Sequence, residues 1–327
     1  MRIVFMGTPA FAVPTLQQIL NTEFSVVGVV CQPDRPSGRG KKIQVGPVKT
    51  LALSRGIPVV QPEKMKDPRF MKTLHAWEPD VIVVAAFGRI LPKIILDLPL
   101  KGCLNVHGSL LPKYRGAAPI QWAVIHGEVE TGITIMCMDE GMDTGRILQQ
   151  EVIGIGPDET AGELASRMAQ VGGTLLLTTL RGWIAGTLTP YPQNESEATL
   201  APILKKEDGL IDWAWPARNI ANRIRGLSPW PGGYTFLQHE RWGIWKVEVE
   251  GHETGFGRTD FDNLQAPGTI TAVTKQAIRV QTGQGNLNLV DIQPENKKRM
   301  KIADYLAGHR VESGMAFSMA KNQDCGK

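Results

Sequence analysis

Residues 81–86 read VIVVAA and are apolar throughout, which is typical of a strand buried on both faces of a parallel sheet. Outward from this strand, β-branched runs at residues 3–6, 25–31, 58–60 and 102–107 alternate with helical patterns at residues 12–20, 48–55 and 68–76. Strands that alternate with helices predict βαβ units. We therefore expect an α/β fold with a doubly wound, mostly parallel, Rossmann-like sheet.

Two further β-like runs and a long helix complete this first half of the chain. The runs cover residues 131–138 and 147–153, and the helix begins near Thr160. Thr160 and Glu163 have the spacing of a capping box, and apolar residues recur at helical intervals from Leu164 to Leu176. We expect one Rossmann-like domain over residues 1–187.

The sequence changes character after this domain. Prolines and a polar stretch interrupt any periodicity, which predicts a linker over residues 188–204. After a short helix near residues 216–226, brief alternating runs follow at residues 234–237, 244–250, 268–273, 277–280 and 287–292. Short strands at this spacing predict a small OB-like β-barrel over residues 205–312. Residues 313–327 are typical of a tail.

The composition of the chain excludes several classes of protein. No window approaches the roughly 18 apolar residues that a membrane helix needs, and no basic region followed by a long apolar stretch opens the chain. The four cysteines (Cys31, Cys103, Cys137, Cys325) lack CxxC spacing, which argues against a disulfide frame or a zinc site. We expect a cytoplasmic protein without a membrane partner, and nothing demands more than a monomer. The net charge of +4 only weakly suggests a polyanionic partner.

The segment NVHGSLLPKYRG at residues 105–116 carries the richest chemistry. It follows a predicted strand, and ligands of open α/β sheets gather at the carboxyl ends of strands. Asn105 and His107 are two residues apart, so on an extended strand they point the same way. Such an amide and imidazole can serve a developing oxyanion and a proton. Asp143, in the loop DEGMDTG at residues 139–145, is a second candidate that can orient an imidazole.

Each of these candidate residues could instead have an ordinary structural role. An N-x-H pair at a strand end is often a hydrogen-bonding arrangement, and an aspartate between glycines is usually a turn residue. No HExxH, nucleophile elbow or GxxxxGK[ST] occurs, and GTPAFA at residues 7–12 fails the GxGxxG pattern, which weakens a nicotinamide-cofactor reading. The remaining histidines have no metal-like spacing, so we expect no metal: His75, His126, His239, His252 and His309.

Longer stretches of the sequence resemble one known protein family specifically. The run from Asn105 through AAPI at residues 117–120, together with Asp-Thr-Gly at residues 143–145, resembles the folate-dependent formyltransferase family. The resemblance is strongest to its tRNA-formylating members and covers nearly the whole chain. FMGTP at residues 5–9, QPDRP at residues 32–36 and WPG at residues 230–232 belong to it. Gly108 and Arg146 depart from the family pattern, but neither is one of the three polar candidates.

The resemblance implies a reaction and a site. The formyl group of 10-formyltetrahydrofolate would move to the amino group of methionine on initiator tRNA, without a metal. Asn105, His107 and Asp143 would form the transfer site. Seven residues in two loops would bind the folate: Ser109, Leu110, Leu111, Pro112, Arg89, Ile90 and Leu91.

Basic residues would hold the tRNA. The loop at residues 34–42 carries four positive charges and one negative, and its glycines and prolines forbid regular structure. A solvated surface loop is the plain alternative, but the resemblance favours phosphate contacts by Arg39, Lys41 and Lys42. Lys206 is a further candidate in the second domain, which we expect to hold the tRNA body.

Two other functions stay open on the residues alone. A sister enzyme would use the same folate chemistry on a small amine, such as an amino sugar nucleotide, although such a substrate needs neither the basic loop nor a second domain. A non-catalytic RNA-binding protein on an old enzyme fold is the other possibility. Intact Asn105, His107 and Asp143 argue against it.

Overall fold

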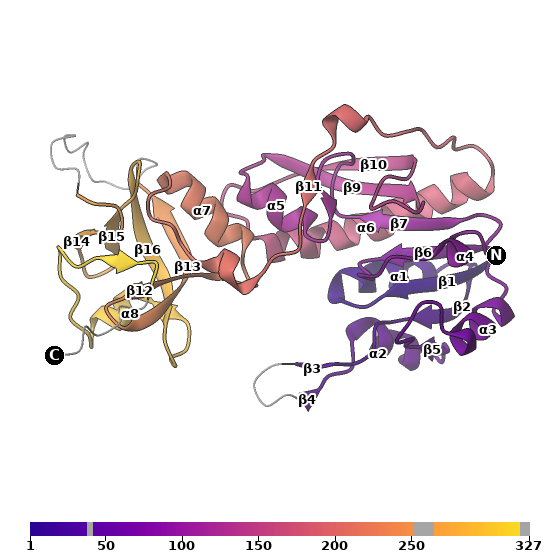
Figure 1. Cartoon of the computed structure of the whole chain (residues 1–327), viewed down its shortest axis with the longest axis horizontal. Coiled ribbons are helices and arrows are strands. Elements are labelled where there is room, and N and C mark those ends of the chain that lie inside the picture. The colour runs from indigo at the N-terminus through magenta and orange to yellow at the C-terminus, as the bar shows by residue number, and fades with distance from the viewer. Residues whose placement is uncertain (38–41, 251–264, 321–327) are drawn as a thin grey trace. The chain divides into compact units, whose positions relative to one another are not determined.

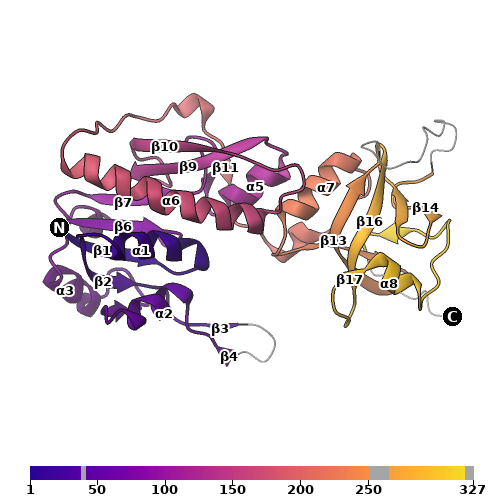
Figure 2. The same ribbon diagram turned by 180° about the vertical axis from the view of Figure 1, so that it is seen from behind.

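The computed structural model describes residues 1–37, 42–250 and 265–320. The chain forms two compact units, and Figures 1 and 2 show both from opposite sides. Unit 1 comprises Met1–Ile120, Glu130–Ile155 and Glu163–Pro202, and unit 2 comprises Gln121–Val129, Gly156–Gly162 and the chain from Ile203 onward. The domain limits expected at residues 187, 204 and 312 stay predictions.

Unit 1 is built on a seven-stranded sheet with the order β10-β9-β7-β6-β1-β2-β5. Its strands are β1 (Arg2–Gly7), β2 (Ser25–Val30), β5 (Val59–Val60), β6 (Val81–Ala85), β7 (Cys103–His107), β9 (Glu130–Cys137) and β10 (Ile147–Gly154). Every pairing among the first five is parallel, while β9 runs antiparallel to both β7 and β10. β6 is buried at all five positions, as its apolar sequence predicts. The predicted doubly wound sheet is confirmed.

Helices cover both faces of this sheet (Figures 1 and 2). They are α1 (Val13–Leu20), α2 (Pro47–Ser54), α3 (Pro68–Ala76), α4 (Lys93–Leu96) and α6 (Ala161–Ile184), with a 3-10 turn at Ala10–Ala12, and α5 (Pro119–Ile125) joins unit 1 to unit 2. Proline stands in the first turn of α1, α2 and α3, where its fixed φ suits a helix start. α3 and α4 pack on one face, and α6 lies on the other, over β7 and β9.

The alternation of β7 decides which residues meet. Cys103 packs in the apolar cluster under α3 and α4. Asn105 and His107 follow at intervals of two and therefore lie on that same face. Val106 points the other way, because the Cγ1 atom of Val106 lies only 3.0 Å from where a Cβ on Gly172 of α6 would stand. The strand thus presents an amide and an imidazole on one face.

The stretch expected as a linker packs along unit 1. Tyr191 forms an antiparallel bridge with Ile147 at the edge of the sheet. A 3-10 turn follows at Glu195–Glu197, and β11 (Leu200–Ala201) then pairs in parallel with β8 (Arg115–Gly116). We call residues 190–201 the return segment. It brings a polar part of the sequence beside the loop after β7.

Unit 2 is a curled antiparallel sheet with the order β14-β15-β16-β13-β12-β18. The strands are β12 (Gly233–Leu237), β13 (Glu240–Val249), β14 (Ile270–Val273), β15 (Ile278–Gln281), β16 (Asn286–Pro294), β17 (Met300–Lys301) and β18 (Phe317–Ser318). A bridge between Thr269 and Ala316 joins the two edges of the curl. α7 (Ala217–Gly226), α8 (Ile302–Leu306) and a 3-10 turn at Lys206–Gly209 accompany the sheet. The predicted OB-like barrel is confirmed.

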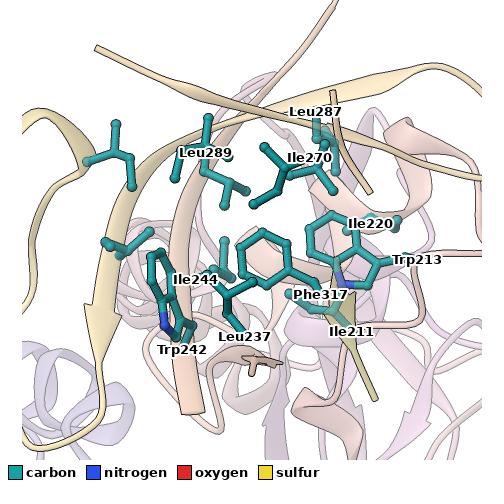
Figure 3. Close-up of a cluster of buried hydrophobic side chains, with 14 of the residues drawn as sticks. Ile211, Trp213, Ile220, Leu237, Trp242, Ile244, Ile270, Leu287, Leu289 and Phe317 are labelled. Carbon is teal, nitrogen blue, oxygen red and sulfur yellow. The ribbon is translucent and has the colours of Figure 1, made fainter. Parts of the chain in front are cut away.

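The curl of unit 2 closes around a purely apolar cluster (Figure 3). Phe317 lies at its centre, with its ring centroid 5.5 Å from that of Trp213 and 5.6 Å from that of Trp242. Residues 313–320, which the sequence suggests to be part of a tail, therefore include a core residue and β18. A single buried phenylalanine between turn residues carries no periodicity, so this strand has no recognisable pattern in the sequence.

Three further features follow from the described residues. None of their helices is long and apolar enough to cross a membrane. Among them, no group of three or more His, Cys, Asp or Glu side chains is placed to hold a metal ion. Cys31, Cys103 and Cys137 are free thiols, while Cys325 lies outside the described residues.

Candidate active site

Asn105 and His107 lie at the carboxyl-terminal end of β7 and are almost fully buried. The exposed fractions of the two residues are 9% and 5%. β9 pairs with β7 so that Asn105 stands opposite Met136 and His107 opposite Thr134. A buried amide and imidazole need hydrogen-bond partners, because an unpaired buried polar group costs roughly 1–3 kcal/mol. Their partners come from two loops that are distant in the sequence.

Asp143 is the first of these partners. The Asn105 Nδ2 atom lies 3.5 Å from Asp143 Oδ1, and the His107 Nδ1 atom lies 3.7 Å from Asp143 Oδ2. Both distances exceed those of strong charge-assisted bonds. The Asn105 amide and the His107 ring therefore face the same carboxylate through long contacts. The three predicted catalytic residues are brought together.

The backbone holds Asp143 in an unusual conformation. Its φ is +56°, a left-handed value that costs a non-glycine residue about 1–2 kcal/mol. The Gly116 amide donates to Asp143 Oδ2 over 2.9 Å, which aims the carboxylate toward β7. Gly116 itself has a φ of +126°, and a Cβ there would lie 2.6 Å from the Ala201 carbonyl oxygen. Only glycine fits this position.

The second partner of His107 is the carbonyl oxygen of Tyr114, which lies 3.1 Å from the His107 Nε2 atom. A carbonyl only accepts, so Nε2 carries a proton and donates it to Tyr114. The other ring nitrogen, Nδ1, faces the Asp143 carboxylate. The arrangement therefore presents one ring nitrogen to an orienting aspartate.

The loop at residues 109–112 is fastened to β9 and β10. Thr134 Oγ1 donates to the Ser109 carbonyl over 2.7 Å and accepts from the Leu111 amide over 3.1 Å. Gln150 Nε2 donates to the Leu111 carbonyl over 2.9 Å. Ser109 and Leu111 are buried, and Leu110 and Pro112 are half-buried. This first predicted folate loop lies directly after β7, which carries Asn105 and His107.

The second predicted folate loop follows the neighbouring parallel strand, β6. Leu91 is buried in the cluster under α3 and α4, whereas Ile90 is 79% exposed. Arg89 donates to the Glu63 carbonyl over 2.8 Å. Met138 thus packs against both the cluster that contains Leu91 and the smaller cluster that contains Leu111.

The predicted tRNA contacts are only partly visible. Arg39 and Lys41 lie outside the described residues, and so does the side chain of Lys42, although its backbone forms β4 (Lys42–Ile43) opposite β3 (Pro36–Ser37). Lys206 begins the 3-10 turn of unit 2 and is exposed. These four residues stay predictions.

Two residues that the sequence does not single out complete the surroundings of Asp143. Gln193, in the return segment, donates from Nε2 to the carbonyls of Asp143 and Gly145, each over 2.8 Å. Arg115 donates to Gln193 Oε1 and also pairs with Glu195 at 2.7 Å. This pairing raises the pKa of Arg115 and lowers that of Glu195. No local motif reveals such contacts, because Gln193 and Asp143 are 50 residues apart.

Unit 2 contains a cavity of about 360 Å³ that is remote from these groups in the sequence. Its lining includes Trp242, Tyr305 and Arg310. None of the three catalytic candidates contributes to it. The convergence of an amide, an imidazole and a carboxylate, rather than the size of a hollow, therefore marks the candidate site.

The chain matches two family models in series. Residues 1–180 match the model described as formyl transferase. Residues 203–310 match the model of the formyl transferase C-terminal domain. Together they cover both units, and the first model alone covers more than half of the chain.

Curated relatives align along nearly the full length. A methionyl-tRNA formyltransferase of Syntrophus aciditrophicus is 49% identical over 313 residues, which cover 95% of this chain and 97% of the relative. A methionyl-tRNA formyltransferase of Myxococcus xanthus is 47% identical, with 96% of each chain covered.

Solved structures share the fold at lower identity. An N-formyltransferase from Helicobacter canadensis superposes with a TM-score of 0.64 at 20% identity, covering 88% of this chain and 98% of its own. A methionyl-tRNA formyltransferase from Clostridium thermocellum gives a TM-score of 0.55 at 17% identity, covering 77% and 95%. With the family models and the close relatives, these likenesses lead to one assignment: the chain belongs to the formyl transferase family.

Proposed function

We propose that this protein transfers the formyl group of 10-formyltetrahydrofolate to the free amino group of methionine on initiator tRNA. The product is N-formylmethionyl-tRNA, which starts translation, so the enzyme works in the cytoplasm. The identity of 47–49% to methionyl-tRNA formyltransferases over almost the entire chain supports this acceptor. The single observation that carries the chemistry is that polar atoms of Asn105 and His107 both lie within 3.7 Å of the Asp143 carboxylate.

Formyl transfer needs an oxyanion to be stabilised and a proton to be moved. The methionine nitrogen attacks the formyl carbon and forms a C–N bond, while the carbonyl π electrons move onto oxygen. When the carbonyl re-forms, the bond from this carbon to N10 of the folate breaks. The attacking nitrogen loses one proton and N10 gains one, so the step balances without a metal or an oxidant.

Asn105 and His107 supply the electrostatic part of this step. Asn105 could donate from its amide, and a protonated His107 from Nδ1, to an oxyanion formed beside these two side chains. Asp143 keeps the ring oriented by facing Nδ1, while the Tyr114 carbonyl fixes the other nitrogen. The carboxylate also lies close enough to receive the amine proton directly or through one water.

The two loops after β6 and β7 are the proposed folate contacts. Residues 109–112 would contact the folate. Residues 89–91 and the loop at residues 139–143 would line a slot for the flat pterin, where backbone groups could bind its hydrogen-bonding edge. The fastening of residues 109–112 to Thr134 and Gln150 supports this role, because a preformed loop loses little conformational freedom on binding.

Basic residues outside the catalytic strand would hold the nucleic acid. Arg39, Lys41 and Lys42 would contact the acceptor end through phosphates, while Lys206 and unit 2 would hold the tRNA body. Removing a single phosphate contact weakens binding and reduces its salt dependence without altering the chemical step. Tight tRNA binding by residues 1–187 alone would overturn this division.

The test compares two acceptors with one enzyme. Labelled formyl from 10-formyltetrahydrofolate is offered to methionine-charged initiator tRNA and, separately, to an amino sugar nucleotide. We expect only the tRNA to be labelled. His107→Ala should abolish most of the transfer, whereas His75→Ala, which alters an exposed histidine at the end of α3, should not.

Each other outcome has a distinct meaning. Labelling of the small amine alone would leave the formyl chemistry standing and replace the acceptor. Failure of both acceptors, with a folded protein that binds folate, would remove the enzymatic proposal. Full activity of His107→Ala would keep the reaction but move the site elsewhere.

A further inference from the structure

Gln193 is the residue through which the return segment reaches the Asp143 loop. Its side-chain Nε2 atom donates to the Asp143 carbonyl and to the Gly145 carbonyl, each over 2.8 Å. A primary amide has two hydrogens, and here both are used on one turn of backbone. We propose that Gln193 is a positioning residue for formyl transfer, which holds the Asp-Thr-Gly turn so that the Asp143 carboxylate faces β7.

The orientation of the Gln193 amide is determined by its partners. Two carbonyls lie on its nitrogen side, and they can only accept. On its oxygen side Arg115 donates from Nε over 3.1 Å and from Nη2 over 2.8 Å. Exchanging the nitrogen and oxygen of the amide would bring like groups together at four contacts. The side chain therefore has a single satisfactory arrangement.

Arg115 is itself held in place from two directions. It is nearly buried, and Glu195 accepts from Nη1 over 2.8 Å and from Nη2 over 2.7 Å. Its backbone pairs with the return segment in β8 and β11, and its amide donates to the Thr199 carbonyl over 2.9 Å. The guanidinium thus links Gln193 to a fixed frame that includes Gly116, the donor to Asp143 Oδ2.

Among the three catalytic candidates, Asp143 is the one whose position depends on the hydrogen bonds of Gln193. Gln193 hydrogen-bonds to the main chain of Asp143, whose own φ is left-handed. A left-handed backbone conformation at a non-glycine residue persists only where the surrounding structure enforces it. If these hydrogen bonds are lost, the turn at residues 143–145 is free to relax and the Asp143 carboxylate moves away from His107. Asn105 and His107 stay in place, because β7 holds them. This inference rests on the proposed function, since it assigns Gln193 a part in the same site.

The first experiment separates catalysis from binding in the full-length chain. Gln193→Ala should lower kcat for formyl transfer roughly 10- to 100-fold, the effect of misplacing a catalytic group by about 1 Å. KM for folate and tRNA should change by less than about twofold, because no substrate contact is lost. Gln193→Met, which keeps the length but has no donors, should behave like Gln193→Ala. Wild-type kcat in Gln193→Met would overturn the inference.

A matched control lies next to Gln193 in the chain. Asn194 is an exposed amide whose bonds run only to Ser196 and Glu197 within its own turn. Asn194→Ala should retain wild-type kcat. An equal loss in both variants would mean that fraying of the return segment, and not the Gln193 bonds, lowers activity.

A double-mutant cycle tests whether Gln193 acts through Asp143. In the background of Asp143→Ala, the additional change Gln193→Ala should lower kcat by no more than about twofold. A general structural defect would instead multiply the two losses. If the double variant lost kcat by the full product of the two single losses, the positioning role of Gln193 would be overturned.

A final readout does not depend on any acceptor. The ring ¹⁵N resonances of His107, assigned by comparison with His107→Ala, report the contact between Nδ1 and the carboxylate. They should move in Gln193→Ala and stay unchanged in Asn194→Ala. An unmoved resonance would overturn the inference even if the wild-type enzyme formylated no tRNA. An inactive wild type with a moved resonance would overturn only the proposed function.

Discussion

A strand in each of the two sheets is buried, but the two strands carry different side chains. In unit 2 the inner face of the curl carries Trp242, Ile244, Leu287 and Leu289, all with no more than 1% of their surface exposed. In unit 1 the equally buried strand β7 carries an asparagine and a histidine on one face. Both sheets exclude water, but among the described residues it is in unit 1 that a buried amide and imidazole face a common carboxylate.

The difference shows how burial is put to use. Apolar burial stabilises in proportion to the area removed from water, at about 25 cal/mol per Å². Polar burial stabilises little unless every group is paired, and around β7 the partners come from residues 114–116, 143–145 and the return segment. Unit 1 therefore uses several distant loops to support one polar face, whereas the inner face of the unit 2 curl is packed with aliphatic and aromatic side chains.

The largest expected effect removes the centre of the apolar sheet. Trp242→Ala should destabilise unit 2 by about 3–5 kcal/mol, because it leaves a cavity beside Tyr305 and Phe317. Hydrogen exchange of peptides from β13 and β16 would measure the loss. Trp230→Ala is the control: that side chain is 53% exposed, and its loss should change stability by less than about 0.5 kcal/mol. Equal protection in both variants would contradict the described core.

The next prediction contrasts a buried asparagine in each sheet. Asn105 is 9% exposed and Asn288, on β16, is 7% exposed. Asn105→Ala should reduce kcat about 100- to 1000-fold, the usual effect of losing one oxyanion donor. Asn288→Ala should leave kcat within about twofold while lowering the urea midpoint. A similar kcat in the two variants would remove Asn105 from the transfer site.

A smaller effect concerns two glycines with positive φ in unit 1. Gly116→Ala adds a clash with the Ala201 carbonyl to the backbone strain and should destabilise by about 2 kcal/mol or more. Gly186, with a φ of +70°, has no atom within 4 Å of an added Cβ. Gly186→Ala should therefore lose only about 1 kcal/mol. Urea unfolding measures both, and a larger loss at Gly186 would contradict the close approach of β8 and β11.

The smallest expected effect lies on β7 itself, two residues before Asn105. Burial raises the pKa of the Cys103 thiol from 9.0 to about 12. The folded state favours the neutral thiol, so this contribution to stability is complete below pH 9.0 and is lost as the pH rises toward 12. Iodoacetamide at pH 9 should label Cys103 far more slowly in the native than in the unfolded chain. Equal rates by mass spectrometry would contradict its burial.

Local periodicity was sufficient for most of the architecture. The apolar run of β6 predicts a central parallel strand, and β6 is buried at every position. In the short helix expected near residues 216–226, the helical spacing of Ile220 and Ile224 indicates one buried side, and both residues are buried in α7. Such patterns succeed because secondary structure repeats every two or 3.6 residues, within the reach of a short window.

Other elements had no such signal. Phe317 is a single core residue among turn residues, so β18 was not expected. Gln193 lies in a polar stretch between prolines that predicts a linker and nothing more. Its four hydrogen bonds join residues that are 48 to 78 positions away.

The sequence by itself determined the α/β unit, the barrel unit and, through strand alternation, the common face of Asn105 and His107. The family resemblance added Asp143 to that pair. Only the tertiary structure decided that the return segment reaches the Asp143 turn and that Tyr114 and Gly116 supply the remaining partners. Hydrophobic periodicity is written into neighbouring residues, whereas a polar side chain gains its partner only when the folded backbone brings a distant segment within about 3 Å.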